Sequence, residues 1–296
     1  GLQKTQDAWR TAMASWQRMQ WLRLGPITQE NDDWKLQFWP DKKNILQRKA
    51  QELLDRNEII TADSLVHASV VVQGFSAQEL LLFDPQFATP ERFAAPSRQC
   101  ELLRAATGRT AIVTRKLAAS WQDTSWLERW ATPAVSNSAL APAQVRNGEL
   151  IDALLAQVER MKADKLGEPM GLKNRDRKPN GYFAESWRSD NSLANLHNNL
   201  MVLQRLTRPE KGYGLFLYLK EKNQQAVADE LVIRIDNAQL ALRQIQPTLV
   251  SAVTQPDQQA ALQTAYRTLG ELASFIKQPL APALGLTLGF NSNDGD

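Results

Sequence analysis

One acidic residue lies inside the most apolar segment of this 296-residue chain. The segment Gly74–Phe83 reads GFSAQELLLF and places Glu79 among apolar side chains. A bare carboxylate is costly to bury, so Glu79 must be paired, hydrogen-bonded or chemically active. On a helix, Ser76 and Glu79 share one face because they are three positions apart. Zinc and iron sites use imidazole, thiolate and carboxylate ligands, so Glu79 could contribute to such a site.

Two interpretations of Glu79 remain open, a metal ligand and a structurally satisfied carboxylate. Ser76 is a poor metal ligand, because a neutral hydroxyl donates little to a transition metal. The chain has two histidines. His67 lies about 180° away from Ser76 around a helix, and His197 is remote in sequence. In the structural interpretation, hydroxyl and backbone groups or an arginine satisfy Glu79; the candidate arginines are Arg10, Arg48 and Arg188.

The sequence argues against hydrolytic catalysis, and we assign no catalytic residue. It contains no His-Glu-x-x-His motif, so ordinary zinc-peptidase chemistry is absent. A Ser-His-Asp triad would require a serine beside His67 or His197. We expect both to be hydrogen-bonded packing residues, His67 within an apolar helix. Cys100 has no evident paired base, which predicts a buried or unreactive thiol.

A second polar block, Glu185–Asn191, reads ESWRSDN and follows the basic loop Lys173–Lys178. One interpretation is the polar wall of a site for an acidic or sugar-like ligand. The other is a helix cap, in which Asp190 or Asn191 precedes a helix beginning near Ser192. The candidate binding residues of this block are Glu185, Ser186 and Arg188.

Three further residues complete the candidate binding set with Gly74, Ser76 and Glu79. Trp39 precedes Pro40 at a helix entry, and we expect it to line a ligand site, whereas the other tryptophans are assigned to the core. Asp294 and Asp296 flank a glycine at the chain end. They could bind a hard cation or form a solvated turn.

Apolar residues recur at three- and four-residue steps along most of the chain, which predicts an all-α fold. A polar linker is predicted over 132–147, because this segment is rich in proline, serine and asparagine. We therefore expect two packed, pseudo-duplicated four-helix bundles, an N-terminal domain over 1–135 and a C-terminal domain over 136–296. The expected helices are 7–24, 40–54, 65–83, 99–130, one from 148, 192–206, 212–236, 238–253 and 258–276.

Composition narrows the class of protein. The net charge is +3, but basic and acidic residues alternate along the chain, so we expect no nucleic-acid partner. A single cysteine excludes an intrachain disulfide. No apolar run reaches the ~20 residues of a membrane span. The chain begins Gly1-Leu2-Gln3 without a methionine, so we expect that a signal peptide has been removed.

Five separated blocks resemble the imelysin-like family, which includes the insulin-cleaving membrane peptidase. Gly74–Phe83 is similar to the family's Gly-x-His-x-x-Glu signature, with Ser76 in place of histidine. The order of the blocks matches the family over nearly the whole chain. They are Trp9 to Pro26, Phe38–Asp41, Gly74–Phe83, Phe183 to Leu193, and Leu288 to Asp296.

The resemblance implies two helical bundles, a site in the cleft between them with the C-terminal tail returning to it, and metal bound by the signature's His and Glu. Iron or another divalent metal is the implied cofactor, with Glu79 as the best candidate ligand. The implied setting is a bacterial periplasmic lipoprotein, lipid-anchored only through its removed N-terminal segment and linked to iron or haem uptake with other envelope components. We expect a non-catalytic, iron-regulated binding protein; the alternatives are a metallopeptidase of the insulin-cleaving type and a polysaccharide-binding module.

Overall fold

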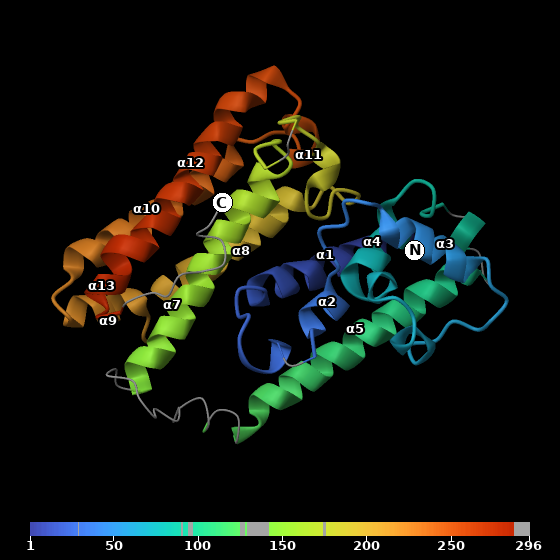
Figure 1. Cartoon of the computed structure of the whole chain (residues 1–296), viewed down its shortest axis with the longest axis horizontal. Coiled ribbons are helices and arrows are strands. Elements are labelled where there is room, and N and C mark those ends of the chain that lie inside the picture. The colour runs from blue at the N-terminus through green and yellow to red at the C-terminus, as the bar shows by residue number, and fades with distance from the viewer. Residues whose placement is uncertain are drawn as a thin grey trace. The chain divides into compact units, whose positions relative to one another are not determined.

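The computed structural model describes residues 1–28, 30–89, 91–93, 97–124, 128, 142–173 and 176–286 (Figure 1). Within these ranges the chain is helical and contains no strand, which confirms the predicted all-α class. The chain forms two compact units. Unit 1 comprises 1–16, 25–126 and 185–191, and unit 2 comprises 17–24, 127–184 and 192–296. The predicted domain boundary at 135/136 lies outside the described residues. No described helix has the length and apolar character of a membrane span.

Unit 1 is built from short helices and turns around one long helix, α5. Its helices are α1 (Leu2–Met19, with its last residues in unit 2), α2 (Asp32–Leu36), α3 (Ile45–Leu54), α4 (Gly74–Phe83) and α5 (Arg98–Gln122). Single 3-10 turns connect them: η1 (Gly25–Thr28), η2 (Ser64–Val66), η3 (Val70–Val72) and η4 (Glu91–Phe93). Helix α4 packs against α2, α3 and α5.

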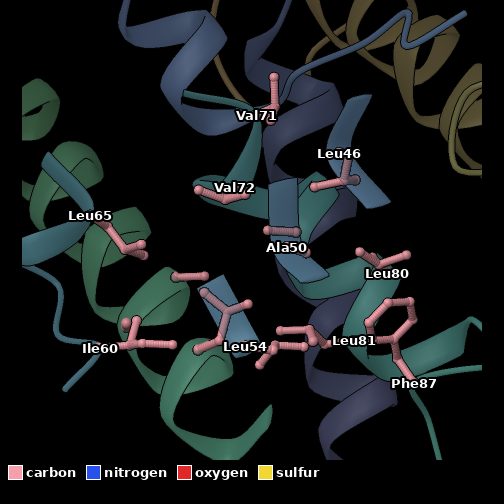
Figure 2. Close-up of a cluster of buried hydrophobic side chains, with 14 residues drawn as sticks. Leu46, Ala50, Leu54, Ile60, Leu65, Val71, Val72, Leu80, Leu81 and Phe87 are labelled. Carbon is pink, nitrogen blue, oxygen red and sulfur yellow. The ribbon is translucent and has the colours of Figure 1, made fainter. Parts of the chain in front are cut away.

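Helix α4 lies between two apolar clusters of unit 1. On one side, Leu80 and Leu81 pack with residues of α3, η3 and α5, including Leu46 and Val72 (Figure 2). On the other side, Phe75 and Leu82 join a cluster with α1, whose contributions are Trp9, Met13 and Trp16. Because apolar side chains cover it all round, α4 is buried from Gly74 to Leu82.

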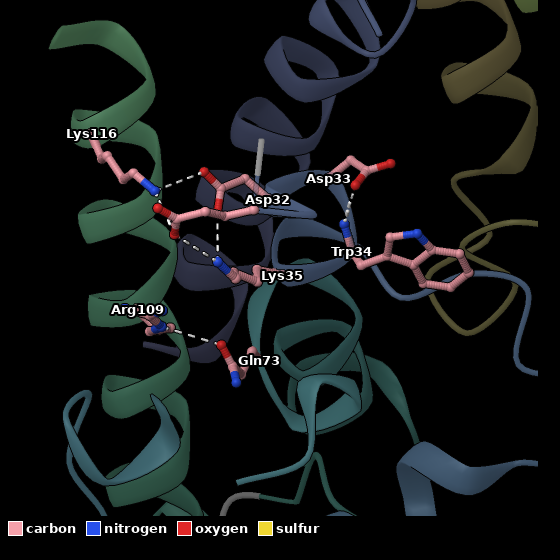
Figure 3. Close-up of polar contacts among 8 residues, drawn as sticks. Asp32, Asp33, Trp34, Lys35, Gln73, Arg109 and Lys116 are labelled. Atoms are coloured by element: carbon pink, nitrogen blue, oxygen red, sulfur yellow. Dashed lines mark hydrogen bonds and ion pairs between the residues drawn. The ribbon is translucent and has the colours of Figure 1, made fainter. Parts of the chain in front are cut away.

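Charged side chains connect α2 to α5 (Figure 3). The buried carboxylate of Asp32 lies 2.8 Å from Lys35 Nζ and 3.4 Å from Lys116 Nζ. Lys116 also contacts Glu30 at 2.7 Å, and this hydrogen bond raises the pKa of Lys116. Since Asp32 is only 1% exposed, its two cations supply the pairing that a buried charge requires.

The glycine of the signature is required by backbone contact. Gly74 has a φ of +69°, in the left-handed region. A Cβ at this position would lie 2.2 Å from the carbonyl oxygen of Leu36 and 2.4 Å from that of Lys35. Beside it, Gln73 donates to the Leu65 carbonyl oxygen and accepts from Arg109. Gly74 therefore lets α4 begin directly against the end of α2.

The helix predicted over 65–83 is wrong in its first half. The turns η2 and η3 occupy most of residues 64–72, and Gln73 adopts an extended backbone conformation. The left-handed backbone at Gly74 prevents one continuous helix. His67 is exposed after η2 and is not a packing residue of an apolar helix. The predicted helix 99–130 is interrupted, since α5 stops at Gln122 and Asp123 is extended.

Unit 2 contains longer helices. They are α7 (Pro142–Arg160), α8 (Ser192–Thr207), α9 (Leu215–Glu221), α10 (Gln225–Arg243), α11 (Leu249–Ala252), α12 (Gln259–Phe275) and α13 (Ala281–Ala283). Two π-helical segments, η5 (Met161–Gly167) and η8 (Ile276–Leu280), extend α7 and α12, and short 3-10 turns occur at η6 (Gly181–Phe183) and η7 (Pro256–Gln258). Helix α10 packs against α8 and α12, and α12 packs against α7 (Figure 1).

Three predicted boundaries in unit 2 were wrong. The helix predicted over 212–236 is broken at Asn223, whose φ of +59° is left-handed. The predicted break near Ala238 does not occur, because the buried stripe of α10 continues through it to Leu242. The predicted linker to Asn147 is too long, since α7 already begins at Pro142, and proline is well suited to a first helical position.

A buried lysine joins the end of α1 to unit 2. Lys165 is 1% exposed. Its Nζ donates to Gln17 Oε1 and Gln20 Oε1 at 2.7 Å and to Asn199 Oδ1 at 2.8 Å. Asn199 also donates to the Gln17 carbonyl oxygen. A lysine ammonium has three donors, and these amide oxygens accept from all three.

Replacing Gly74 with alanine is expected to destabilise unit 1. The new Cβ collides with two backbone carbonyl groups, and the left-handed conformation adds strain, for a combined cost of about 2–4 kcal/mol. Gly148→Ala is the matched control, because nothing lies within 4 Å of its added Cβ in α7. Urea unfolding followed by circular dichroism measures both. Equal unfolding midpoints for the two variants would contradict the proposed close approach.

Replacing Lys165 with methionine is expected to destabilise unit 2 by about 3 kcal/mol or more, because buried amide oxygens lose their donor. The control is Lys173→Met, which removes an exposed ion pair with Asp164 and should change stability by less than about 1 kcal/mol. Thermal and urea unfolding test the difference. Similar effects of the two substitutions would show that the amide cage around Lys165 contributes little.

Candidate functional site

Glu79 lies in the middle of α4, a helix that has no solvent-facing side. Its side chain is 6% exposed, and Ser76 and Gln78 beside it are also buried. Each therefore needs a protein partner. Ser76 Oγ donates to the Phe38 carbonyl oxygen at 2.9 Å. Gln78 Nε2 donates to Thr110 Oγ1 at 2.8 Å.

The partner of Glu79 is Ser189, 110 residues away in sequence. The backbone N–H of Ser189 donates to Glu79 Oε1 at 3.0 Å, and the Ser189 hydroxyl lies 2.8 Å from the same oxygen. Both residues belong to unit 1. The sequence left two possible partners for Glu79, an arginine or hydroxyl and backbone groups. The structure shows hydroxyl and backbone groups, both from Ser189. Arg10 instead contacts Asp7 and stacks on Phe83.

A strained turn delivers Ser189 to this position. Ser186 and Asp190 have φ values of +53° and +54°, which side chains rarely adopt. The turn is closed by the hydrogen bond from Asn191 N–H to the Ser186 carbonyl oxygen at 3.1 Å. The same carbonyl oxygen lies 3.1 Å from the Ser189 hydroxyl. Strain of this kind persists only where the surrounding contacts hold it, and it concentrates at functional sites.

Arg188 fixes the turn to α3 and α4. Its Nε lies 2.9 Å from Asp84 Oδ2, and its Nη2 donates to Asn44 Oδ1 at 2.9 Å. The guanidinium stacks on the Trp187 ring at 4.1 Å. Asp84 ends α4 and Asn44 precedes α3, so Arg188 ties the turn to both helices and does not pair directly with Glu79.

A second buried carboxylate lies in the same turn. Glu185 is 1% exposed, and its Oε1 accepts from Gln37 Nε2 at 3.0 Å. Gln37 Oε1 accepts in turn from Trp16 Nε1 at 2.6 Å. Unit 1 thus buries two acidic side chains, Glu79 of α4 and Glu185 of the turn, and each accepts a hydrogen bond from a neutral donor.

Burial raises the pKa of Glu79 from 4.5 to about 7, because desolvation disfavours the carboxylate. The Ser189 hydrogen bonds and the Arg188 charge lower it, and the Glu185 charge raises it. The Ser189 hydroxyl donates to Glu79 Oε1 and lies 3.1 Å from the Ser186 carbonyl oxygen. Ser189 therefore stabilises the charged form of Glu79 against the larger effect of burial.

The donor set around Glu79 does not fit a transition metal. Ser76 offers a neutral hydroxyl that is already bonded to a carbonyl oxygen, and Glu79 faces the donors of Ser189. Across the described ranges, no group of three or more histidine, cysteine, aspartate or glutamate side chains could hold a metal ion. His197 Nδ1 is 2.7 Å from Gln239 Oε1, as expected of a hydrogen-bonded packing residue.

The structure brings Ser76, Glu79, Glu185, Ser186 and Arg188 into one region of unit 1, around α4 and the 185–191 turn. Trp39 is half-buried, and its expected place at a ligand site stays a prediction. Asp294 and Asp296 lie outside the described residues. The half-buried Cys100 Sγ lies 3.7 Å from the Phe93 carbonyl oxygen.

Sequence reasoning missed the residues that satisfy the two buried acids. Ser189 was within the polar block but was not chosen, and Gln37 and Asp84 were not considered. The sequence carries one usable signal, because polar residues that flank apolar runs must bond to something once buried. It gives no indication of which distant segment supplies the partner.

The comparisons with known proteins agree with the predicted resemblance. The imelysin family model, which is classed with the peptidases, matches residues 1–276. Iron-regulated protein A of Synechococcus elongatus is 23% identical over 292 residues, covering 95% of this chain and 74% of the relative. The chain therefore belongs to the imelysin family.

Two solved structures share the fold. An imelysin-like protein from Psychrobacter arcticum has a TM-score of 0.79 at 23% identity, over 98% of this chain and 83% of the other. A putative iron-regulated protein A precursor from Parabacteroides distasonis has a TM-score of 0.64 at 16% identity, over 91% and 80%. At these identities the likeness establishes the architecture only.

The raised pKa of Glu79 makes stability depend on pH. The folded state holds this proton up to about pH 7, whereas the unfolded chain releases it near pH 4.5. The stabilisation is therefore complete below pH 4.5 and is lost as pH rises to 7, by roughly 3 kcal/mol. Glu79→Gln should remove this part of the profile. Urea unfolding between pH 4 and 8 measures it.

Ser189→Ala provides the matched control for this titration, because it removes a hydrogen bond that lowers the pKa of Glu79. The pH-dependent loss of stability should then extend to higher pH. An unchanged profile in Glu79→Gln would contradict the assignment of this titration to Glu79.

Proposed function

We propose that this chain is a non-catalytic binding component of iron or haem uptake in the bacterial cell envelope. The observation that carries the proposal is the state of Glu79. Its carboxyl is buried, raised in pKa and bonded to Ser189, while Ser76 occupies the signature position of histidine. The chain keeps the glycine and glutamate of the family signature but lacks its histidine, and its glutamate is bonded to Ser189. This arrangement suits a binding protein better than a metallopeptidase.

The link to iron rests on relatives. The Synechococcus relative is named iron-regulated protein A, and the Parabacteroides relative is a putative precursor of a protein with the same name. We propose that this chain shares their iron-responsive expression. We also propose that it is exported to the periplasm, since a precursor is a chain that is processed after synthesis.

The turn 185–191 is the proposed binding element. Its left-handed residues Ser186 and Asp190 are strained, and its side chains connect to α3 and α4 through Arg188. In this proposal Glu79 anchors the turn, and a ligand or partner is recognised at its accessible residues, the exposed Asp190 and the half-buried Trp187 and Arg188. Glu79 takes no part in bond cleavage.

A deletion and complementation experiment tests the function. Loss of the gene should slow growth of the parent bacterium under iron limitation and leave iron-replete growth unchanged. Glu79→Gln, which keeps hydrogen-bond capacity without an ionisable group, should restore growth as well as the unmodified protein does. Arg188→Ala, which releases the turn from Asp84 and Asn44, should restore it poorly. Both variants should be checked for equal abundance.

Peptide hydrolysis separates this proposal from the metallopeptidase alternative. Purified protein supplied with Zn²⁺ or Fe²⁺ should leave the insulin B chain intact. Cleavage that disappears in Glu79→Gln would establish the peptidase alternative. Failure of the deletion to respond to iron would contradict the link to iron uptake.

A further inference from the structure

A groove in unit 2 combines positive charge with aromatic surface. It is an open hollow of about 640 Å³ over α10, α12 and the π-helical segments η5 and η8. This volume falls in the range of small-molecule sites. All of its lining residues belong to unit 2, whereas Glu79 and its partners belong to unit 1.

The charges of the groove leave one cation uncompensated. Arg234 Nε pairs with Glu230 at 2.8 Å. Glu271 lies 3.7 Å from Arg267 and 3.9 Å from Arg234. Within the part of the chain that the structure describes, Lys162 Nζ has no carboxylate partner. It lies over the Tyr266 ring instead, 4.9 Å from the ring centroid. A cation–π contact leaves that positive charge in place.

Two aromatic rings lie near Lys162 in the groove. Tyr266 and Phe275 both line the groove, and Arg234 lies 5.2 Å over the Phe275 ring. Gly270 lets the Lys162 side chain lie close against α12, because an added Cβ there would lie 3.2 Å from Lys162 Cε and 3.3 Å from Nζ. The hydroxyl of Ser274 and the amide of Gln278 are the neutral polar groups available at the edge.

Two π-helical segments contribute to the same groove. Lys162 comes from η5, and Gln278 and Pro279 come from η8. Such segments are rare and occur frequently at functional sites, because the wider turn displaces side chains from their regular positions. Their coincidence at one hollow is an observation independent of its charge.

We propose that this groove binds a small organic anion, a carboxylate attached to a flat aromatic or apolar body. Lys162 holds the carboxylate, Ser274 and Gln278 supply further hydrogen bonds, and the body lies against Tyr266 and Phe275. Gly270 allows the Lys162 side chain to take this position against α12. This proposal does not depend on the function assigned to unit 1.

Calorimetric titration of the full chain with 1-naphthoate tests the proposal. Neutral 1-naphthalenemethanol keeps the aromatic body but lacks the charge, and inorganic phosphate carries charge but lacks the aromatic body. Naphthoate should bind at least tenfold more tightly than either probe. Lys162→Gln should weaken naphthoate binding at least tenfold, since a charge-assisted hydrogen bond is lost.

Two further variants keep the test specific. Gly270→Leu displaces the Lys162 side chain from α12 without removing its charge, and it should abolish binding with circular dichroism unchanged. Lys222→Gln is the matched control, because Lys222 lies 5.6 Å over the Tyr218 ring outside this groove, and it should bind normally. Absence of naphthoate binding, equal binding of either comparison probe, or normal binding by Lys162→Gln would overturn the proposal.

Discussion

Unit 1 depends on one constraint, the burial of α4 on every side. A helix without a solvent-facing side must find a partner inside the protein for each of its polar groups. Gly74 permits the necessary approach of α2. Ser76, Gln78 and Glu79 then bond to the backbone before α3, to α5 and to the 185–191 turn. The turn is strained at Ser186 and Asp190, and we infer that bonding to α4 is what holds it in this form.

This chain has the fold of the imelysin family, but its signature residues make their own set of hydrogen bonds. A family match over residues 1–276 and two similar solved folds establish the architecture. The chemistry depends on particular atoms, and here the signature serine donates to a carbonyl oxygen while the glutamate bonds to Ser189. Unit 2 satisfies a buried charge by the same principle, since amide oxygens surround the ammonium of Lys165.

The sequence predicted the helical class, the burial of Glu79 and the hydroxyl-or-backbone alternative for its partner. Those features are local, because periodicity and an acid in an apolar run can be recognised within a few turns of helix. It did not predict that residues 64–72 form turns, since the left-handed Gly74 is fixed by contact with distant carbonyl groups. It also did not identify Ser189 or Gln37, because 110 and 148 residues separate the partners in these two buried contacts. Periodicity alone likewise failed at Asn223 and Ala238 in unit 2.

The central claim is that Glu79 is a buried, serine-bonded carboxyl and an anchor for the turn. The most direct measurement is the pH titration of its side-chain carboxyl by ¹³C NMR, with Glu79→Gln used to assign the resonance. The account predicts a midpoint of about pH 7, which shifts upward in Ser189→Ala. A midpoint at or below 4.5, or one that is unaffected by Ser189→Ala, would contradict it.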